Sequence, residues 1–204
     1  MRPFYSNATT RLAAHNKMSA NQLETLAEVC CTLHDVGKLS MKWQEAVKKW
    51  QQYKNPQKLT GTPLAHSDYE PDMDFENKKK FPKQPPHAAE GAYSVAGWLK
   101  GCFGDNAIAV WTSIARHHGA FTASLEGFRL IDGVEKWVGE TLPSSIWGIT
   151  LTDSPDRLTQ DNFQNDLLIF SGTNSEDTGL WPLYVFLVRR LRLADQRSQK
   201  GGEG

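Results

Sequence analysis

Apolar residues recur every three or four positions along much of the chain, which predicts a mostly helical protein. The first apolar stripe, within residues 19–35, comprises Leu23, Leu26, Ala27 and Cys30. Ser19 and Gln22 have the spacing of a capping box, so this helix is expected to begin at Ser19. Gly37 is a helix stop signal just beyond the end of the stripe.

Three further helices are expected in the middle of the chain. Residues 40–53 carry the stripe Trp43, Ala46, Val47 and Trp50, and the pair Asn55-Pro56 ends it. Residues 85–104 follow two prolines, with the apolar face Ala92, Val95, Ala96 and Leu99. Residues 105–119 are expected to begin at Asp105 as N-cap and to stop at Gly119.

The C-terminal part ends in a long predicted helix. Pro182 suits its first turn, and it runs through 183–199 to a disordered Gly-rich tail at about 199–204. Residues 133–142 and 161–170 are expected to form short helices, and 171–179 a loop. A flexible Pro-rich loop is expected at about 55–86. Without repeats or strand alternation, the chain is interpreted as one all-α domain over 1–204.

Composition narrows the classes of protein further. Lys plus Arg and Asp plus Glu number 23 each, so no overall basic charge indicates a nucleic-acid partner, although a local basic cleft stays compatible. The three cysteines have no metal-ligand spacing and suit a reduced, cytoplasmic protein. No apolar run approaches the ~20 residues that span a bilayer, so no membrane association is expected.

Histidines stand at the ends of three predicted helices. His34 and Asp35 close the first, His87 opens another, and His117 and His118 close the next. Helix ends in a bundle can converge on one pocket. A lone histidine is more often solvated or structural, but three clusters at three helix ends favour a shared metal site.

Asp195 adds a carboxylate to this set. Val188 and Leu191 precede it by seven and four residues, so it projects from the apolar face of the last helix. A buried carboxylate needs a cation or a metal. A salt bridge to Arg116 or Lys38 is the alternative, but metal ligation accounts for the aspartates and histidines together.

These residues carry a family resemblance. The segments "LHDVGK", "HAAEGA", "RHHGAF" and "RLADQRS" resemble the HD superfamily of metal-dependent phosphohydrolases. The doubled histidine, the "RLADQRS" ending and the aromatic-Gln pair in "KLSMKWQEAV" are similar to the HD nuclease domain of type I CRISPR-associated helicase-nucleases. The resemblance runs from about residue 12 to 198 and implies an HD-domain helical bundle with its metal site at helix ends.

The resemblance also implies a ligand set for one or two divalent ions. The implied ligands are His15, His34, Asp35, His87, His117, His118 and Asp195. Asp35 would bridge two ions. His34 and Asp195 would hold the first ion with an upstream histidine, for which His15 is the candidate. The other three histidines would hold the second ion, whereas His66 matches no motif and is interpreted as solvated.

Imidazole and carboxylate together suit Mn²⁺, Fe²⁺, Co²⁺, Ni²⁺ or Zn²⁺ better than Mg²⁺, which prefers oxygen ligands. Such ions lower the pKa of bound water for an in-line displacement at phosphorus. Asp35 and Lys38 are the expected catalytic residues, and Lys38 and Arg116 are the expected phosphate contacts.

The function expected from this resemblance is hydrolysis of phosphodiester bonds in single-stranded DNA. Its implied partners are a helicase, fused or separate, and a CRISPR surveillance complex. One alternative is an HD phosphohydrolase acting on nucleotides or cyclic dinucleotides through the same site. Another is a non-catalytic HD scaffold, which would bind no metal.

Overall fold

The computed structural model describes residues 3–68, 85–119, 127–143, 146, 148–154 and 177–200. Its α-helices are α1 (Pro3–His15), α2 (Ala20–Leu33), α3 (Met41–Lys54), α4 (His87–Phe103), α5 (Ala107–Ala115), α6 (Val134–Gly139) and α8 (Trp181–Lys200). Short 3₁₀ turns are η1 (Val36–Leu39), η2 (Pro56–Lys58), η4 (Gly104–Asn106) and η5 (Asp177–Leu180). Over these residues there is no strand, only two isolated antiparallel bridges. The prediction of an all-α fold is confirmed.

Helix α2 forms as its sequence pattern predicted. Ser19 is the N-cap, and its hydroxyl accepts from the backbone of Gln22, whose side chain accepts from the backbone of Ser19, which completes the capping box. All four residues of the predicted stripe are buried. The stripe of α3 is buried as well, and α3 ends with Asn55 as its C-cap.

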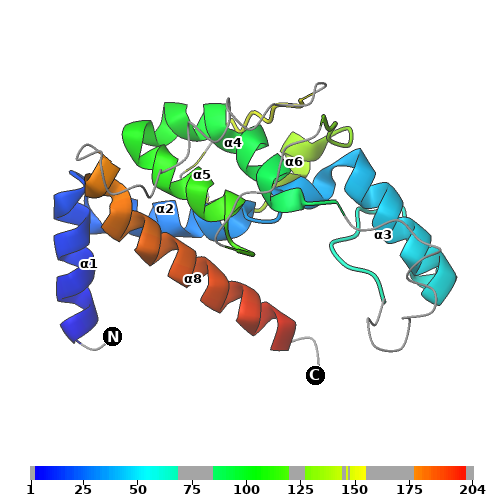
Figure 1. Cartoon of the computed structure of the whole chain (residues 1–204), viewed down its shortest axis with the longest axis horizontal. Helices are drawn as coiled ribbons and strands as arrows, with labels where there is room; N and C mark the ends of the chain where they lie inside the picture. The colour runs from blue at the N-terminus through cyan, green and yellow to red at the C-terminus, as the bar shows by residue number, and fades with distance from the viewer. Residues whose placement is uncertain are drawn as a thin grey trace.

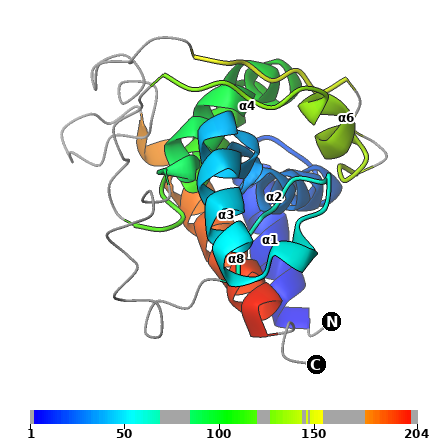
Figure 2. The same ribbon diagram turned by 90° about the vertical axis from the view of Figure 1, so that its right-hand side faces the viewer.

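The helices pack in an order that brings distant parts of the sequence together. Helix α4 packs along α5, α5 and α2 both contact α8, and α1 packs on α2. Figure 1 shows α8 crossing the bundle diagonally, with α4 and α5 on one side and α1 at one end. Figure 2, turned by 90°, shows α3 in front of the others. The core lies where α2, α4, α5 and α8 meet.

Helix α8 is fixed to α2 by apolar and ionic contacts. Its inner face presents Leu183, Leu187 and Leu191, all of them buried. On its outer side Arg190 makes a bidentate contact with Glu24 of α2, at 2.9 and 3.1 Å. Arg190 therefore links α8 to α2.

Helix α5 differs from its prediction at both ends. Asp105 is not the N-cap: it lies in η4 and pairs with Lys100 at 2.6 Å, and Asn106 occupies the cap position. The helix ends at Ala115 rather than at Gly119. His117 and His118 therefore lie in the turn after the helix, where the chain can aim both side chains in one direction.

Other sequence predictions are tested only where the structure describes the chain. A short helix was predicted over 133–142 and is present as α6. Pro182 lies in the first turn of α8. The predicted helix at 161–170, much of the predicted loop at 55–86 (residues 69–84) and the tail at 201–204 lie outside the described residues. Within the described part, no helix is long and apolar enough to cross a membrane.

Candidate metal centre

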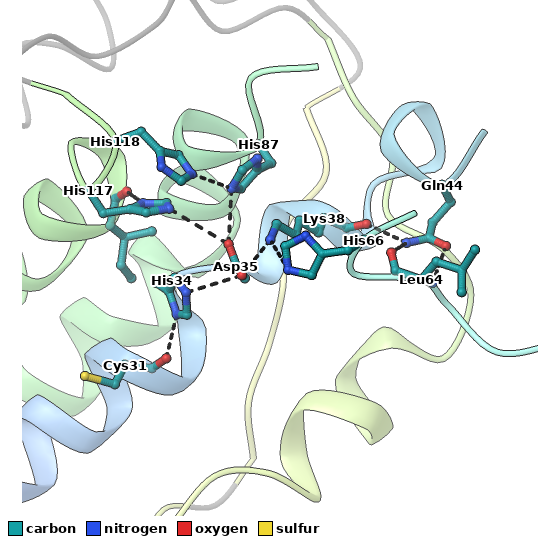
Figure 3. A network of polar contacts seen from close by, with 11 residues as sticks. Cys31, His34, Asp35, Lys38, Gln44, Leu64, His66, His87, His117 and His118 are labelled. Carbon is teal, nitrogen blue, oxygen red and sulfur yellow. Dashed lines mark hydrogen bonds and ion pairs between the residues drawn. The ribbon is translucent and has the colours of Figure 1, made fainter. Parts of the chain in front are cut away.

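Asp35 lies at the centre of a group of polar side chains (Figure 3). Helix α2 ends at Leu33, and Asp35 then leaves the helical conformation with φ −102° and ψ 7° before η1 begins. This break turns the carboxylate toward α4 and α5. Its Oδ2 lies 3.3 Å from His34 Nε2 and its Oδ1 lies 3.1 Å from His87 Nε2.

Two glycines allow η1 to cross the first turn of α4 at this point. A Cβ on Gly37 would lie 1.9 Å from the carbonyl oxygen of His87 and 2.7 Å from the nitrogen of Gly91. Only a residue without a side chain fits such a contact. Gly37 is therefore needed for the close approach of the η1 and α4 backbones. The helix-stop role predicted from the sequence does not include this contact.

His87 is the first residue of α4 and is buried. Its ring packs edge-on against Trp43 of α3, with 4.6 Å between centroids. Its Nε2 also lies 3.1 Å from Nε2 of His118. His87 thus connects Asp35, from one end of α2, with the turn that follows α5.

His117 is oriented by a hydrogen bond to its own helix. Its Nδ1 lies 2.6 Å from the carbonyl oxygen of Ile114, so Nδ1 carries the proton and donates. The Nε2 atom is then a lone-pair acceptor that points 3.9 Å from Asp35 Oδ1. It is buried and has no hydrogen-bond partner among the described residues. The Nδ1 of His34 likewise lies close to a carbonyl oxygen of its own helix, that of Cys31, at 2.7 Å.

These donors are arranged as metal ligands usually are. One ligand atom each from Asp35, His87, His117 and His118 lies within 4.8 Å of all the others. Metal-bound histidines commonly donate their second ring N–H to a carbonyl, which fixes the tautomer, and His117 does so. A divalent cation would satisfy the buried lone pair of His117 and the converging nitrogens together. The residues present fit a metal ion.

The electrostatics of the group depend on Asp35. Burial raises the pKa of Asp35, but its hydrogen bonds with His34 and His87 outweigh burial and hold the pKa well below its ordinary range. Burial, together with the neighbouring imidazoles, lowers the pKa of His117 to about 4. Burial also lowers the pKa of His34, but Asp35 more than compensates, so the net pKa of His34 is raised. At neutral pH the site presents an ionised carboxylate and a neutral His117.

Lys38 shares the carboxylate with these histidines. Its Nζ lies 2.8 Å from Asp35 Oδ2, and its side chain is only 9% exposed. The ammonium also lies over the ring of Trp43, 5.6 Å from the centroid. A buried cation that touches the central carboxylate is suitably placed for the negative charge of a phosphate.

His66 lies beside Lys38, which the sequence interpretation missed. Its Nε2 is 3.4 Å from Lys38 Nζ, although the residue as a whole is exposed, as expected. Gln44, which follows Trp43 in the aromatic-Gln pair, could have indicated this neighbour. A buried glutamine side chain needs hydrogen-bond partners, and these can come from a segment distant in sequence. Its amide contacts both backbone groups of Leu64.

Two other predicted site residues, His15 and Arg116, are not part of the four-ligand group. His15 is exposed at the end of α1, with its Nε2 3.1 Å from the carbonyl oxygen of Gly179, and it is not in the four-ligand group. Burial lowers the pKa of Arg116, and the charge that acts on it is that of Tyr184 on α8.

Asp195 approaches the site without joining the four-ligand group. It is half-buried on α8. Its charge acts to raise the pKa of His34, His66 and His118, although burial leaves the net pKa of His66 and of His118 lowered. The role of Asp195 as a metal ligand stays a prediction.

Arg192 is a second residue that sequence reasoning missed. Its Nε donates to the carbonyl oxygen of His117 at 3.3 Å, and Nη2 reaches the carbonyl of Arg116 at 3.5 Å. Carbonyls at a helix C-terminus lack partners within the helix and attract cations. Arg192 therefore supports the turn that carries His117 and His118. Its spacing along α8 gave no sign of this role.

An all-α bundle with carboxylate and imidazole groups converging from helix ends is the architecture of an HD domain. The family model described as "Cas3, HD domain" matches residues 2–141, which is more than half of the chain. The chain belongs to this family. The family is one of metal-dependent hydrolases, and it supports a metal-dependent nuclease role in type I CRISPR systems. No curated protein matches the chain significantly.

The match covers the whole four-ligand group. Asp35, His87, His117 and His118 all lie within the matched residues, as does Lys38. Asp195 lies beyond the end of the match at residue 141. Its place near the site therefore comes from the fold of α8 alone.

Proposed function

We propose that this chain is a single HD nuclease domain that hydrolyses phosphodiester bonds of single-stranded DNA in type I CRISPR interference. It works in the cytoplasm with a helicase, fused or separate, and with a CRISPR surveillance complex. The nuclease part of this proposal is supported by the candidate metal centre together with family membership. The partners are supported by family membership alone.

One observation supports the metal-dependent chemistry best. His117 Nε2 is buried, lacks a hydrogen-bond partner among the described residues, and points at Asp35 with its proton held on the opposite nitrogen. Leaving a buried polar group unsatisfied costs about 1–3 kcal/mol. A scaffold would have no reason to retain that cost, whereas a metal ligand requires a free lone pair.

The proposed ligands are Asp35, His87, His117 and His118, with His34 and Asp195 adjacent for a further ion. His15 is left out because its side chain contacts Gly179 instead. The donor set suits one or two transition-metal ions, Mn²⁺, Fe²⁺, Co²⁺, Ni²⁺ or Zn²⁺, better than Mg²⁺. When bound, such ions supply an activated water and neutralise charge at phosphorus.

The residues of the chain have distinct roles around that chemistry. Asp35 holds the centre together, because it contacts two imidazoles and Lys38 at once. Lys38 brings positive charge to the developing charge of the phosphate. The neutral imidazole of His117 is available as a ligand without first losing a proton, since its pKa is lowered to about 4.

The test is a cleavage assay on labelled single-stranded DNA, with each metal added separately to metal-stripped protein. Asp35→Ala should abolish metal binding and cleavage. Asp132→Ala is the matched control, because Asp132 is an exposed carboxylate outside the candidate centre and should behave as wild type.

Two results would contradict the proposal. Hydrolysis of nucleotides or cyclic dinucleotides with no cleavage of single-stranded DNA would favour the small-molecule phosphohydrolase. Failure of the wild-type protein to bind any of the metals in calorimetry would favour a scaffold.

A further inference from the structure

A short segment without regular secondary structure, residues 64–68, lies along α3 and is held there by two buried glutamines. Gln44 donates to the carbonyl of Leu64 at 2.9 Å and accepts from its N–H at 2.9 Å. Gln51 accepts from the N–H of Asp68 at 2.9 Å and donates to its carboxylate at 3.2 Å. We call residues 64–68 the strap.

The two anchors match the strap in length. Gln44 and Gln51 are seven residues apart, which is about 10.5 Å along a helix. The four residue steps from Leu64 to Asp68 can span at most about 13 Å. The strap therefore runs beside α3 with little slack, and His66 falls at its middle.

The first anchor also fixes the strap relative to the site. The amide of Gln44 donates to the carbonyl of Lys38 at 2.7 Å, in addition to its bonds with Leu64. One buried side chain thus joins the backbone of η1 to the backbone of the strap. Figure 3 shows the result: the ring of His66 faces the Lys38 ammonium from the side away from His117 and His118.

The contact between His66 and Lys38 determines the tautomer of the imidazole. An ammonium group has only donors, so Nε2 of His66, 3.4 Å from Nζ, must accept. Partial burial of the ring lowers the pKa of His66, and the charge of Lys38 lowers it further, so the ring is neutral at pH 7. Its proton then lies on Nδ1, which has no partner among the described residues. This N–H is an available donor on an exposed residue.

We infer that His66 and Lys38 form a phosphate-binding pair for the nucleic-acid strand, with Lys38 Nζ supplying charge and His66 Nδ1–H supplying a hydrogen bond to a non-bridging oxygen. This inference rests on the proposed nuclease function and identifies a substrate contact for it. Gln44 and Gln51 are positioning residues, because they hold the strap beside α3 and, in the case of Gln44, join it to the backbone of Lys38. His66 is not proposed as a metal ligand, since its Nε2 already faces a cation.

The test measures DNA binding apart from chemistry. Anisotropy of a fluorescein-labelled oligothymidylate is followed on metal-stripped full-length protein, wild type against His66→Ala and His66→Asn. Loss of one charge-assisted hydrogen bond should weaken binding about 5- to 20-fold in His66→Ala. His66→Asn places an amide N–H near the position of Nδ1 and should recover most of the affinity.

Kinetics and metal binding separate this role from others. With metal added, His66→Ala should raise KM by a similar factor and leave kcat within about twofold, as expected for a contact made equally in ground and transition states. Its affinity for Mn²⁺ in calorimetry should equal that of wild type. Gln51→Leu removes the second anchor of the strap, whose contacts are with Asp68 and Asn55, and should reduce the affinity for oligothymidylate by less than His66→Ala does. Gln57→Ala, exposed in η2, is the control that should change nothing.

Several outcomes would overturn the inference. Equal DNA affinity for wild type and His66→Ala would remove the contact, and weakened Mn²⁺ binding in His66→Ala would make His66 a ligand instead. Wild-type protein that binds no oligothymidylate would exclude the pair as well. If the wild-type protein binds the oligonucleotide through His66 but does not cleave it with any of the added metals, the proposed nuclease function fails while the binding contact stands.

Discussion

Gly37 and Gly91 lie backbone against backbone, and this contact brings Asp35 to His87. A Cβ on Gly37 would come within 2.7 Å of the Gly91 nitrogen and 1.9 Å of the His87 carbonyl oxygen. Because these neighbours are main chain, they can yield only if η1 and α4 move apart. The distance between the two proposed ligands therefore depends on one missing methyl group.

The first prediction follows from that contact. Gly37→Ala should destabilise the fold by roughly 2–4 kcal/mol, as forced overpacking does, and should weaken Mn²⁺ binding. Urea denaturation and calorimetry would measure both effects. Gly97→Ala is the control: a Cβ there meets nothing within 4 Å, and alanine in a helix interior should stabilise by about 0.5–1 kcal/mol. A Gly37→Ala protein as stable as wild type would contradict the packing argument.

The second prediction concerns the pH dependence of the metal-free protein. Burial lowers the pKa of His117 to about 4 when folded, against about 6.5 in the unfolded chain. Between these values the unfolded state binds more protons, so stability rises with pH across this window and is lost as pH falls. The effect is at most about 3 kcal/mol.

His117→Gln cannot ionise and should lack this part of the slope, so wild type should lose stability relative to the variant between pH 6.5 and 4. Urea midpoints at several pH values would measure the difference. His34 contributes to the pH dependence of stability with the opposite sign, because its raised pKa stabilises the folded state at low pH. This contribution is present in both proteins and cancels in the comparison. Parallel curves would show that the pKa of His117 does not change on folding.

The third prediction tests the support of the histidine turn by α8. Arg192 donates to the carbonyl of His117 through one long contact of 3.3 Å. Arg192→Ala should therefore weaken Mn²⁺ binding about 3- to 10-fold, at or below the range for residues that orient metal ligands. Arg189→Ala, an exposed arginine on the same helix, is the control. Equal calorimetric affinities for both variants would limit Arg192 to a surface role.

Sequence periodicity predicted the elements well because it reports local burial. The stripe of α2, the capping box at Ser19 and the burial of Trp43 and Trp50 in α3 all follow from spacing and side-chain chemistry within one helix. The clustering of Asp35 with histidines from other helices required a further step, the convergence of helix ends. That step is a property of helical bundles rather than of any one segment.

What the sequence did not reveal are contacts between residues far apart in the chain. Gly37 has a helix-stop position, and nothing local indicates that its missing Cβ admits α4. His66 stands in a proline-rich loop, and its place depends on Gln44, twenty-two residues earlier. Arg192 is one of several arginines along α8, and its position in the sequence does not distinguish it from Arg190, which pairs with Glu24. Each contact depends on tertiary packing, which periodicity within one element does not encode.

The fourth prediction separates two readings of the upstream histidine. The resemblance assigns a ligand role to His15, whereas its Nε2 contacts the Gly179 carbonyl outside the four-ligand group. His15→Ala should therefore bind Mn²⁺ as wild type does. His87→Ala removes a buried ligand atom 3.1 Å from Asp35 and should lower the affinity by at least about 100-fold.

Calorimetry on metal-stripped protein measures both variants, and circular dichroism checks that each remains helical. A large loss in His15→Ala would mean that α1 moves to bring His15 to the site when metal binds. That result would show a metal-bound arrangement different from the one described. Unchanged affinity in both variants would instead remove His87 from the ligand set, and with it the link between the end of α2 and the turn after α5.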